Sequence, residues 1–162
     1  MRALLTACLL FSWLPGRSQR IVLPDGEYMD TTITRQSGCQ GKPTARYYSV
    51  NGKYPRSSDT LREQAQAFLQ RSGHSYSGSG YVTFRFVVDC SGKRLPRTQV
   101  LQTDARYQRY RFQPELVEKL YAYLTTLNDW HIARSPNGQE TANYIAYIAF
   151  KINHGKVVAV CP

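Results

Sequence analysis

Several residue patterns that mark well-known catalytic centres do not occur in this sequence. It has no HExxH, which would place two zinc ligands on one helix, and no CxxC, which would indicate a zinc or redox site. The phosphate-binding loops GxxxxGK[ST] and GxGxxG and the nucleophile elbow GxSxG are also missing. The sequence therefore contains no recognisable metalloprotease, nucleotide-binding or α/β-hydrolase motif.

Side chains that could act as acids, bases or ligands are few and scattered. The chain has 3 histidines and 11 acidic residues among 162. Asp89 and Asp104 bracket an expected hairpin, where aspartate commonly stabilises turns, and no spacing of carboxylates suggests a general acid–base pair. A nucleophilic Cys–His pair that includes Cys90 has no support from the spacing. We therefore expect no catalytic residues, no metal site and no cofactor, which makes the protein a non-enzyme.

No apolar run is long enough to cross a bilayer as a helix, which needs about 20 residues. The longest mainly apolar stretch, Ala3 to Leu14, follows Arg2 and precedes small residues, which is typical of a secretory signal peptide. We expect residues 1–18 to be removed on export to the periplasm or the outer membrane, leaving a mature chain without a transmembrane helix. A lipid anchor on Cys8 and a buried N-terminal strand are the alternatives.

Tyrosine and positive charge are abundant. The chain has 12 tyrosines, and 21 Lys and Arg residues against 11 acidic residues give a net charge of +10. Aromatic side chains favour sheet surfaces. A basic exported protein can bind anionic lipid, polysaccharide or acidic proteins, and nucleic acid is a less expected partner outside the cytoplasm.

One segment combines both features. Its basic and aromatic residues are Arg106, Tyr107, Arg109, Tyr110 and Arg111. We interpret them as a candidate binding surface for an acidic partner or a glycan. A solvated connecting loop is the plainer reading, and stacking of single-stranded nucleic acid is a third.

The periodicity of apolar residues predicts two helices. The first begins near Thr60, where Thr60-x-x-Glu63 forms a capping box, and ends before Gly73. The second begins at Pro114 and runs to about residue 127, and Trp130 after it is expected to cap the core.

The expected strands alternate with these helices. They cover residues 80–88, about 97–103, about 141–152 and 156–160, with hairpin turns at Asp89–Gly92 and Asn153–Gly155. Val82, Phe84, Phe86 and Val88 alternate along the first strand and should face the core. The order helix–hairpin–helix–hairpin predicts an α+β fold over residues 58–162, with two layers and the helices packed on one face of a small antiparallel sheet.

Residues 19–57 have weak periodicity and are expected to form an N-terminal extension, with short strands at Ile21–Leu23 and Arg46–Val50. An exported chain would keep Cys39, Cys90 and Cys161, which allow one disulfide in three pairings. The sequence does not choose among them. We favour Cys39–Cys90 because it would join the extension to the sheet, while a free or reactive thiol at Cys90 stays open.

The run Gly80-x-Val82-x-Phe84-x-Phe86-x-Val88-x-x-x-Gly92 resembles the first hairpin of the TonB C-terminal domain. The similarity continues through Trp130, Asn137-Gly138-Gln139 and Ala149-Phe150-Lys151-Ile152, and it covers roughly residues 76–153. Val-Asp-Cys-Ser-Gly and the C-terminal FKINHGKVVAVCP further resemble small exported bacterial proteins that carry this domain.

This resemblance implies helices packed against a three-stranded antiparallel sheet. In TonB the domain lies in the periplasm and adds a strand to a peptide of an outer-membrane transporter. The chain lacks the membrane-spanning helix and Pro-rich linker of an energy transducer, and its last strand, residues 156–160, could cover the edge that TonB leaves for its partner.

These observations predict a non-enzymatic module of the cell envelope that binds a protein partner through sheet edges and the segment from Arg106 to Phe112. A homodimer is also allowed. The alternatives are an exported enzyme that acts on cell-wall polymer and a secreted glycan-binding protein.

Overall fold

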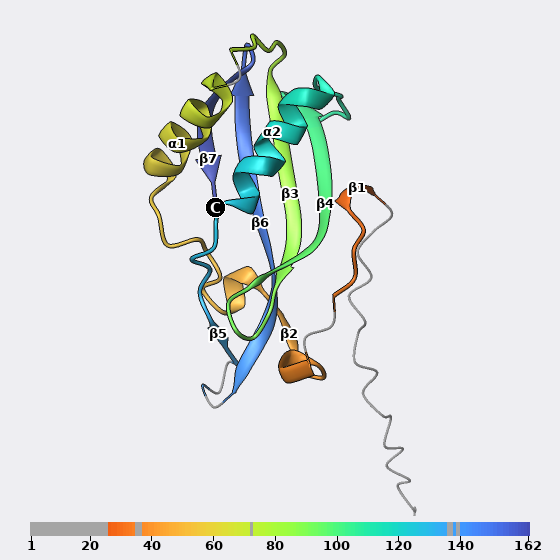
Figure 1. The fold of residues 1–162 in the computed structure, drawn as a ribbon, viewed down its shortest axis with the longest axis vertical. Helices are drawn as coiled ribbons and strands as arrows, with labels where there is room; N and C mark the ends of the chain where they lie inside the picture. Colours follow the sequence, from red (N-terminus) through yellow and green to blue (C-terminus); the bar gives the residue numbers. More distant parts are fainter. Residues whose placement is uncertain (1–25, 35–36, 72, 136–137, 139) are drawn as a thin grey trace, which may run out of the picture.

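The computed structural model describes residues 26–34, 37–71, 73–135, 138 and 140–162 (Figure 1). The expected signal peptide, Cys8, the strand at Ile21–Leu23, and Asn137 and Gln139 of the TonB-like pattern lie outside these residues. The strands are β1 Glu27–Asp30, β2 Thr44–Arg46, β3 Gly80–Val88, β4 Arg94–Asp104, β5 Ala133–Arg134, β6 Thr141–Asn153 and β7 Lys156–Cys161. The helices are η1 Ser37–Cys39, η2 Tyr47–Ser49, α1 Ser58–Gln70 and α2 Pro114–Thr125.

The described strands form one seven-stranded mixed sheet. Its main order is β1-β4-β3-β6-β2, and both β5 and β7 also pair with β6. The central strand β3 pairs antiparallel with β4 on one side and with β6 on the other. By contrast, β2 runs parallel to β6 over Asn143–Ile145. The long β6 therefore joins most of the sheet together.

The core lies on the face of the sheet that the helices cover. Val82, Phe84, Phe86 and Val88 of β3 are each at most 1% exposed, so the predicted alternation is confirmed. Two stripes from α1 and α2 pack onto this face, and their buried residues are Leu61, Ala65 and Leu69 from α1, and Leu116, Val117, Leu120, Tyr123 and Leu124 from α2. Burying each of the Leu and Val side chains contributes about 1.5–3 kcal/mol.

The expected fold class, a two-layer α+β fold with helices packed on one face of a small antiparallel sheet, is wrong. The described chain is mostly a seven-stranded mixed sheet, and it has only two short α-helices. In Figure 1 these helices lie over the upper half of the sheet, and β3, β4 and β6 extend below them. The physical reason is that β1 and β2, which come from residues 19–57, join the sheet edges, so the sheet outgrows its helical cover.

Loops, rather than helices, cover the lower half of the core. Trp130 is 5% exposed and packs edge-on against Phe86 and Tyr54, with ring centroids 5.0 Å and 4.7 Å away. This confirms that Trp130 caps the core. Tyr144 donates from its hydroxyl to the carbonyl of His131 at 3.0 Å, which anchors the same loop.

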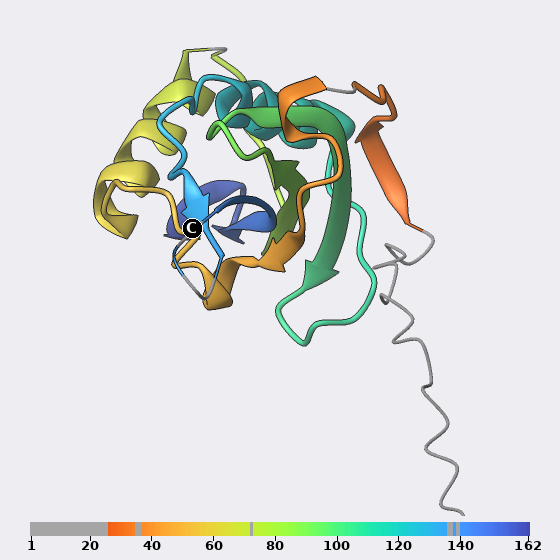
Figure 2. The same cartoon turned by 90° about the horizontal axis from the view of Figure 1, so that it is seen from below.

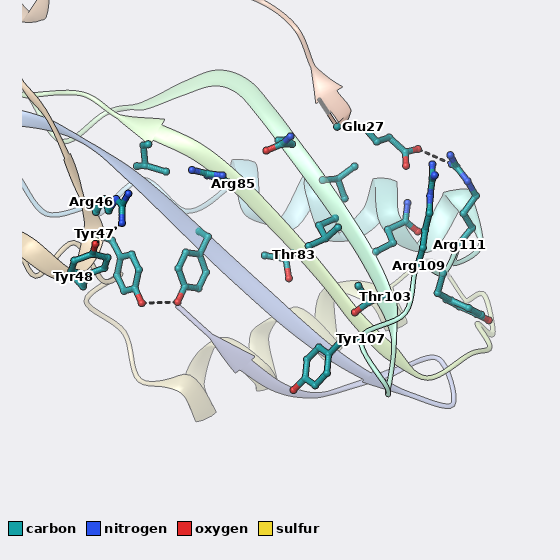
Figure 3. Close-up of a pocket in the computed structure, with 18 residues that line it drawn as sticks. Glu27, Arg46, Tyr47, Tyr48, Thr83, Arg85, Thr103, Tyr107, Arg109 and Arg111 are labelled. Atoms are coloured by element: carbon teal, nitrogen blue, oxygen red, sulfur yellow. Dashed lines mark hydrogen bonds and ion pairs between the residues drawn. The ribbon is translucent and has the colours of Figure 1, made fainter. Parts of the chain in front are cut away.

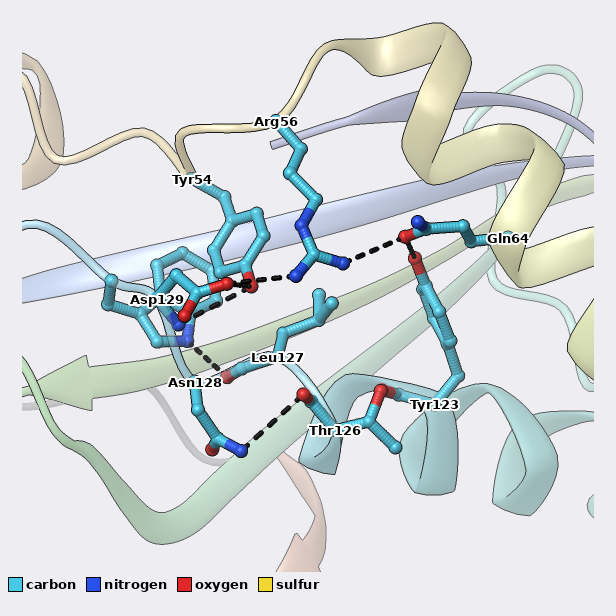
Figure 4. Close-up of polar contacts among 9 residues, drawn as sticks. Tyr54, Arg56, Gln64, Tyr123, Thr126, Leu127, Asn128 and Asp129 are labelled. Carbon is cyan, nitrogen blue, oxygen red and sulfur yellow. Dashed lines mark hydrogen bonds and ion pairs between the residues drawn. The ribbon is translucent and has the colours of Figure 1, made fainter.

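A polar network joins these loops to the helices (Figure 4). Asp129 accepts hydrogen bonds from the hydroxyl of Tyr54 at 3.2 Å and from Arg56 Nη2 at 2.8 Å. Arg56 Nη1 also donates to Gln64 Oε1 at 3.0 Å, and Tyr123 donates to the same oxygen at 3.4 Å. Because these side chains pair with one another between the loops and the helices, we interpret the network as structural.

Three local predictions need correction. The N-cap of α1 is Ser57, whose Oγ accepts from the N–H of Thr60 at 3.1 Å, so Thr60 lies inside the first turn. Strand β4 begins at Arg94, because a bulge opposite Phe86–Val88 accommodates Pro96 within the strand. The expected strand Arg46–Val50 ends at Arg46 and continues as η2.

Both predicted hairpin turns are confirmed. Gly92 has φ 82° and Gly155 has φ 73°, which are left-handed conformations that favour glycine. A side chain at Gly155 would also overlap the backbone carbonyl of Tyr76. These turns fix the register of the long strands that carry the candidate site.

Candidate functional site

The sheet face opposite the helices is hollowed into a groove. Figure 2 shows both helices on one side of the sheet and residues 105–112 extending from the other side. The groove has a volume of about 900 Å³, and its floor includes Thr83 and Arg85 of β3, Leu101 and Thr103 of β4, and Tyr147 of β6. These residues alternate with core residues of the same strands and therefore point away from the core. We call this site the open-face groove (Figure 3).

The first side of the groove, the tyrosine wall, consists of Arg46, Tyr47 and Tyr48. Parallel pairing of β2 with β6 brings this segment beside Tyr147. The rings of Tyr47 and Tyr147 meet edge to face at 4.6 Å, and the Tyr147 hydroxyl donates to the Tyr47 hydroxyl at 2.8 Å. Arg46 Nη1 donates to the Tyr48 hydroxyl at 2.8 Å. The Tyr47–Tyr147 contacts therefore fix the tyrosine wall to the sheet, and the Arg46–Tyr48 hydrogen bond joins two of its own residues.

A disulfide anchors the segment that leads into the tyrosine wall. Cys39 and Cys90 are bonded, with their Cα atoms 5.5 Å apart, so the favoured pairing is confirmed, while Cys161 is free and exposed. The side-chain amide of Asn143 strengthens the junction, because it accepts from the N–H of Cys90 at 2.9 Å and donates to the carbonyl of Cys39 at 3.2 Å.

The opposite side, the loop wall, consists of Tyr107, Arg109, Tyr110 and Arg111. Asp104 organises the turn that starts this loop, since its Oδ1 accepts from the N–H groups of Arg106 at 2.8 Å and Gln108 at 2.9 Å. The backbone of Arg109 then forms an isolated antiparallel β-bridge with Thr103. The N–H of Tyr110 donates to the carbonyl of Gln102 at 3.1 Å. The loop wall therefore continues the sheet along the outer edge of β4.

Tyr107 stands at the end of the groove, stacked on a second tyrosine. Its ring lies 5.1 Å from that of Tyr81 with 11° between the ring planes, and it is 71% exposed. Its backbone has φ 62°, an uncommon conformation for a bulky residue. The contact with the Tyr81 hydroxyl raises the pKa of Tyr107.

Positive charge dominates the groove. Its described lining contains four arginines, Arg46, Arg85, Arg109 and Arg111, against one acidic side chain, Glu27. Glu27 is already paired, because its Oε1 lies 2.9 Å from Arg111 Nη1 (Figure 3). No ion pair to Arg85 or Arg109 occurs among the described residues. Arg85 and Arg109 therefore present guanidinium groups that form no ion pair with another described residue.

The structure brings together most of the residues that the sequence singled out. Tyr107, Arg109, Tyr110 and Arg111 all line the groove, whereas Arg106 is exposed and does not line it. Tyr110 also packs edge-on against Phe112 at 4.8 Å, and Phe112 is buried in the core.

Sequence reasoning missed the tyrosine wall and the floor. The sequence could have indicated Arg85, because β3 alternates between buried and outward-facing residues and Arg85 is the charged residue among those that face outward. Tyr147 likewise occupies an outward-facing position, between buried neighbours in β6. No local signal places Tyr47 beside Tyr147, because their contact depends on pairing between distant segments.

The two aspartates considered as catalytic candidates are turn residues. Asp89 Oδ1 accepts from the N–H groups of Ser91 at 2.9 Å and Lys93 at 3.0 Å, much as Asp104 does in its own turn. Within the described ranges, no cluster of three or more His, Cys, Asp or Glu side chains could hold a metal ion. None of the helices described here is long and apolar enough to cross a membrane.

Comparison with known proteins gives no match, neither to a family model, nor to a curated protein, nor to a solved structure. The resemblance of residues 76–153 to the TonB C-terminal domain therefore stays a prediction about family, and the seven-stranded mixed sheet differs from the fold that it implied.

Proposed function

We propose that this chain is a non-enzymatic, exported binding protein that holds a negatively charged partner in the open-face groove. The observation that carries the proposal is the set of four arginines around a groove whose described acidic residue, Glu27, is already paired with Arg111.

Charge in a concave site acts more strongly than the same charge on an open surface. Arginine stays protonated at all physiological pH values, and its planar guanidinium matches the geometry of carboxylate, sulfate and phosphate groups. Arg85 and Arg109 come from the floor and the loop wall, so an anion in the groove would meet cations from more than one element. This arrangement supports binding of an acidic partner.

The groove chemistry favours binding over catalysis. Besides arginine and Glu27, the titratable side chains of its described lining are tyrosines. The hydrogen bond to Tyr47 and partial burial raise the pKa of Tyr147 to about 12, so its phenol stays protonated near neutral pH and is a poor general base.

The face of the sheet is a better docking surface than the edges of its long strands β4 and β6. Strand addition needs unpaired backbone groups. The outer edge of β4 pairs with β1 and with the loop wall, and β6 pairs with β2 and β7 on its outer side. Side chains on the open face, rather than these strand edges, therefore carry the proposed contact.

The Cys39–Cys90 disulfide supports the exported location, because disulfides persist mainly in oxidising compartments. Reduction of this bond would remove the covalent link between the segment leading to the tyrosine wall and the β3–β4 turn, while the hydrogen bonds of Asn143 to both backbones would remain.

The test compares two charge-neutralised proteins. Arg85→Gln/Arg109→Gln removes two groove cations, and Arg106→Gln/Arg71→Gln removes the same charge from exposed positions outside the groove. Binding to dextran sulfate, polyglutamate and polygalacturonate is measured by calorimetry at several salt concentrations. We expect the groove variant to lose at least about tenfold in affinity for the preferred polymer. Equal losses in both variants would show that net charge alone attracts the polymer and would refute the groove.

A further inference from the structure

We infer that the partner is an acidic polysaccharide, which lies lengthwise in the open-face groove and passes over the Tyr81–Tyr107 pair. This inference rests on the proposed function and names the chemical class of its ligand.

The groove cations are spread out rather than gathered around one point. In Figure 3, Arg46 and Arg85 lie toward the tyrosine wall, whereas Arg109 and Arg111 lie at the loop wall. A single small anion is bound best by donors that converge on it. Separated guanidinium groups instead match a ligand with several negative charges along its length.

The positive surface continues beyond the groove into a second pocket. This pocket has a volume of about 270 Å³ and is lined by Tyr81 and Lys151, among others. No ion pair to Lys151 occurs in the described part of the chain. Tyr81 lines the second pocket and Tyr107 lines the groove, so their stacked rings stand at the junction. A polysaccharide that passes from the groove into the second pocket would meet the groove arginines, then the Tyr81–Tyr107 pair, and then Lys151.

The polar groups of the groove suit a ligand rich in hydroxyl groups. Thr83, Thr103 and Tyr147 on the floor and Tyr47 beside them supply hydroxyl oxygens that can accept hydrogen bonds. The hydroxyls of Thr83, Thr103 and Tyr47 can also donate, whereas that of Tyr147 already donates to Tyr47. Tyr107 and Tyr48 are 71% and 62% exposed, and their rings can pack against the apolar faces of sugar rings.

The same rings are poorly arranged for nucleobases or an extended peptide. Successive bases stack on aromatic rings that follow one another along a strand, but Tyr81 takes one face of Tyr107, Tyr47 packs against Tyr147, and the exposed rings of Tyr107 and Tyr48 belong to opposite walls. A peptide that added as a strand would need free backbone groups, and the floor of the groove is a sheet face whose strands are paired on both sides. The geometry therefore favours the acidic glycan.

The test uses the full oxidised protein and defined oligomers. Calorimetry compares a galacturonate hexasaccharide with its disaccharide, with maltohexaose, with hexaglutamate and with oligo-dT of equal charge. We expect the uronate hexasaccharide to bind at least about tenfold more tightly than each of the others. Tyr107→Ala should weaken hexasaccharide binding, and Lys151→Gln should weaken it while leaving disaccharide binding unchanged. Circular dichroism confirms folding, and Tyr107→Phe, which keeps the ring, should bind like the parent protein.

The outcomes separate this inference from the proposed function. Hexaglutamate or oligo-dT could bind as tightly as the uronate hexasaccharide, or more tightly, and lose this binding in Arg85→Gln/Arg109→Gln. That result would contradict an acidic glycan as the ligand but would still support an anion-binding groove. Equal affinity for the hexasaccharide and the disaccharide would overturn the lengthwise path. Failure of every anionic oligomer to respond to the groove substitutions would overturn both.

Discussion

Replacing Cys39 and Cys90 together by alanine should lower the free energy of unfolding by about 4 kcal/mol. The two residues are separated by 51 positions along the chain. A crosslink stabilises the fold mainly by limiting the conformations of the unfolded chain, and the chain-entropy relation for a loop of this length gives that value at 25 °C.

The folded state should change little in this variant. The side chain of Asn143 still contacts the backbones of residues 39 and 90, and β2 still pairs with β6. The cost should therefore come from the unfolded state, and the tyrosine wall should keep its place below the unfolding transition. Binding of an anionic oligomer in the groove should be nearly unchanged at low temperature.

Urea unfolding measures this effect. Both proteins carry Cys161→Ser, so that the exposed free thiol cannot exchange with the disulfide. We expect a lower midpoint and a higher m-value in the variant, because its unfolded chain exposes more surface. A loss below about 1 kcal/mol would refute the reasoning, since a crosslink of this span would then not be limiting the unfolded ensemble.

Two further predictions concern the core and the groove. Phe86→Ala should cost about 3–5 kcal/mol in urea unfolding, since Phe86 is 1% exposed and packs on Trp130; a loss under about 1 kcal/mol would contradict the strand register. The pKa of Tyr147 is raised from about 10 to about 12, so the folded state favours the neutral phenol. The stability that this preference contributes is complete below pH 10 and should be lost as the pH rises toward 12. Tyr147→Phe should reduce this loss of unfolding free energy at alkaline pH, whereas the control Tyr48→Phe should leave the loss unchanged. If the free energy of unfolding depends on pH in the same way in Tyr147→Phe and in the parent protein, the hydrogen bond to Tyr47 is contradicted.

The long elements could be predicted from the sequence because their patterns are local. Strand β3 alternates over its whole length, and α2 begins at a proline and carries an apolar stripe. The loop wall was found for the same reason, since its aromatic and basic residues are contiguous. A short-range pattern thus located one side of the groove.

The other side of the groove could not be predicted, because it depends on pairing between distant segments. Strands β1, β2 and β5 have 4, 3 and 2 residues, which is too short for a periodic signal. Their neighbours in the sheet stabilise them, so the extension that seemed irregular provides β1 and β2. The two-layer expectation failed because it treated these residues as outside the sheet.

The position of β2 has a consequence for the order in which the protein folds. Cys39 and Asn143, which meet at this junction, are 104 residues apart, and β2 has no partner strand until β6 is present. The β3–β4 hairpin and the Cys39–Cys90 bond involve closer segments and can form earlier. Because distant contacts form slowly, we expect the tyrosine wall to be the last part of the groove to assemble. Ligand binding during refolding would then report the end of folding, later than a signal from the core.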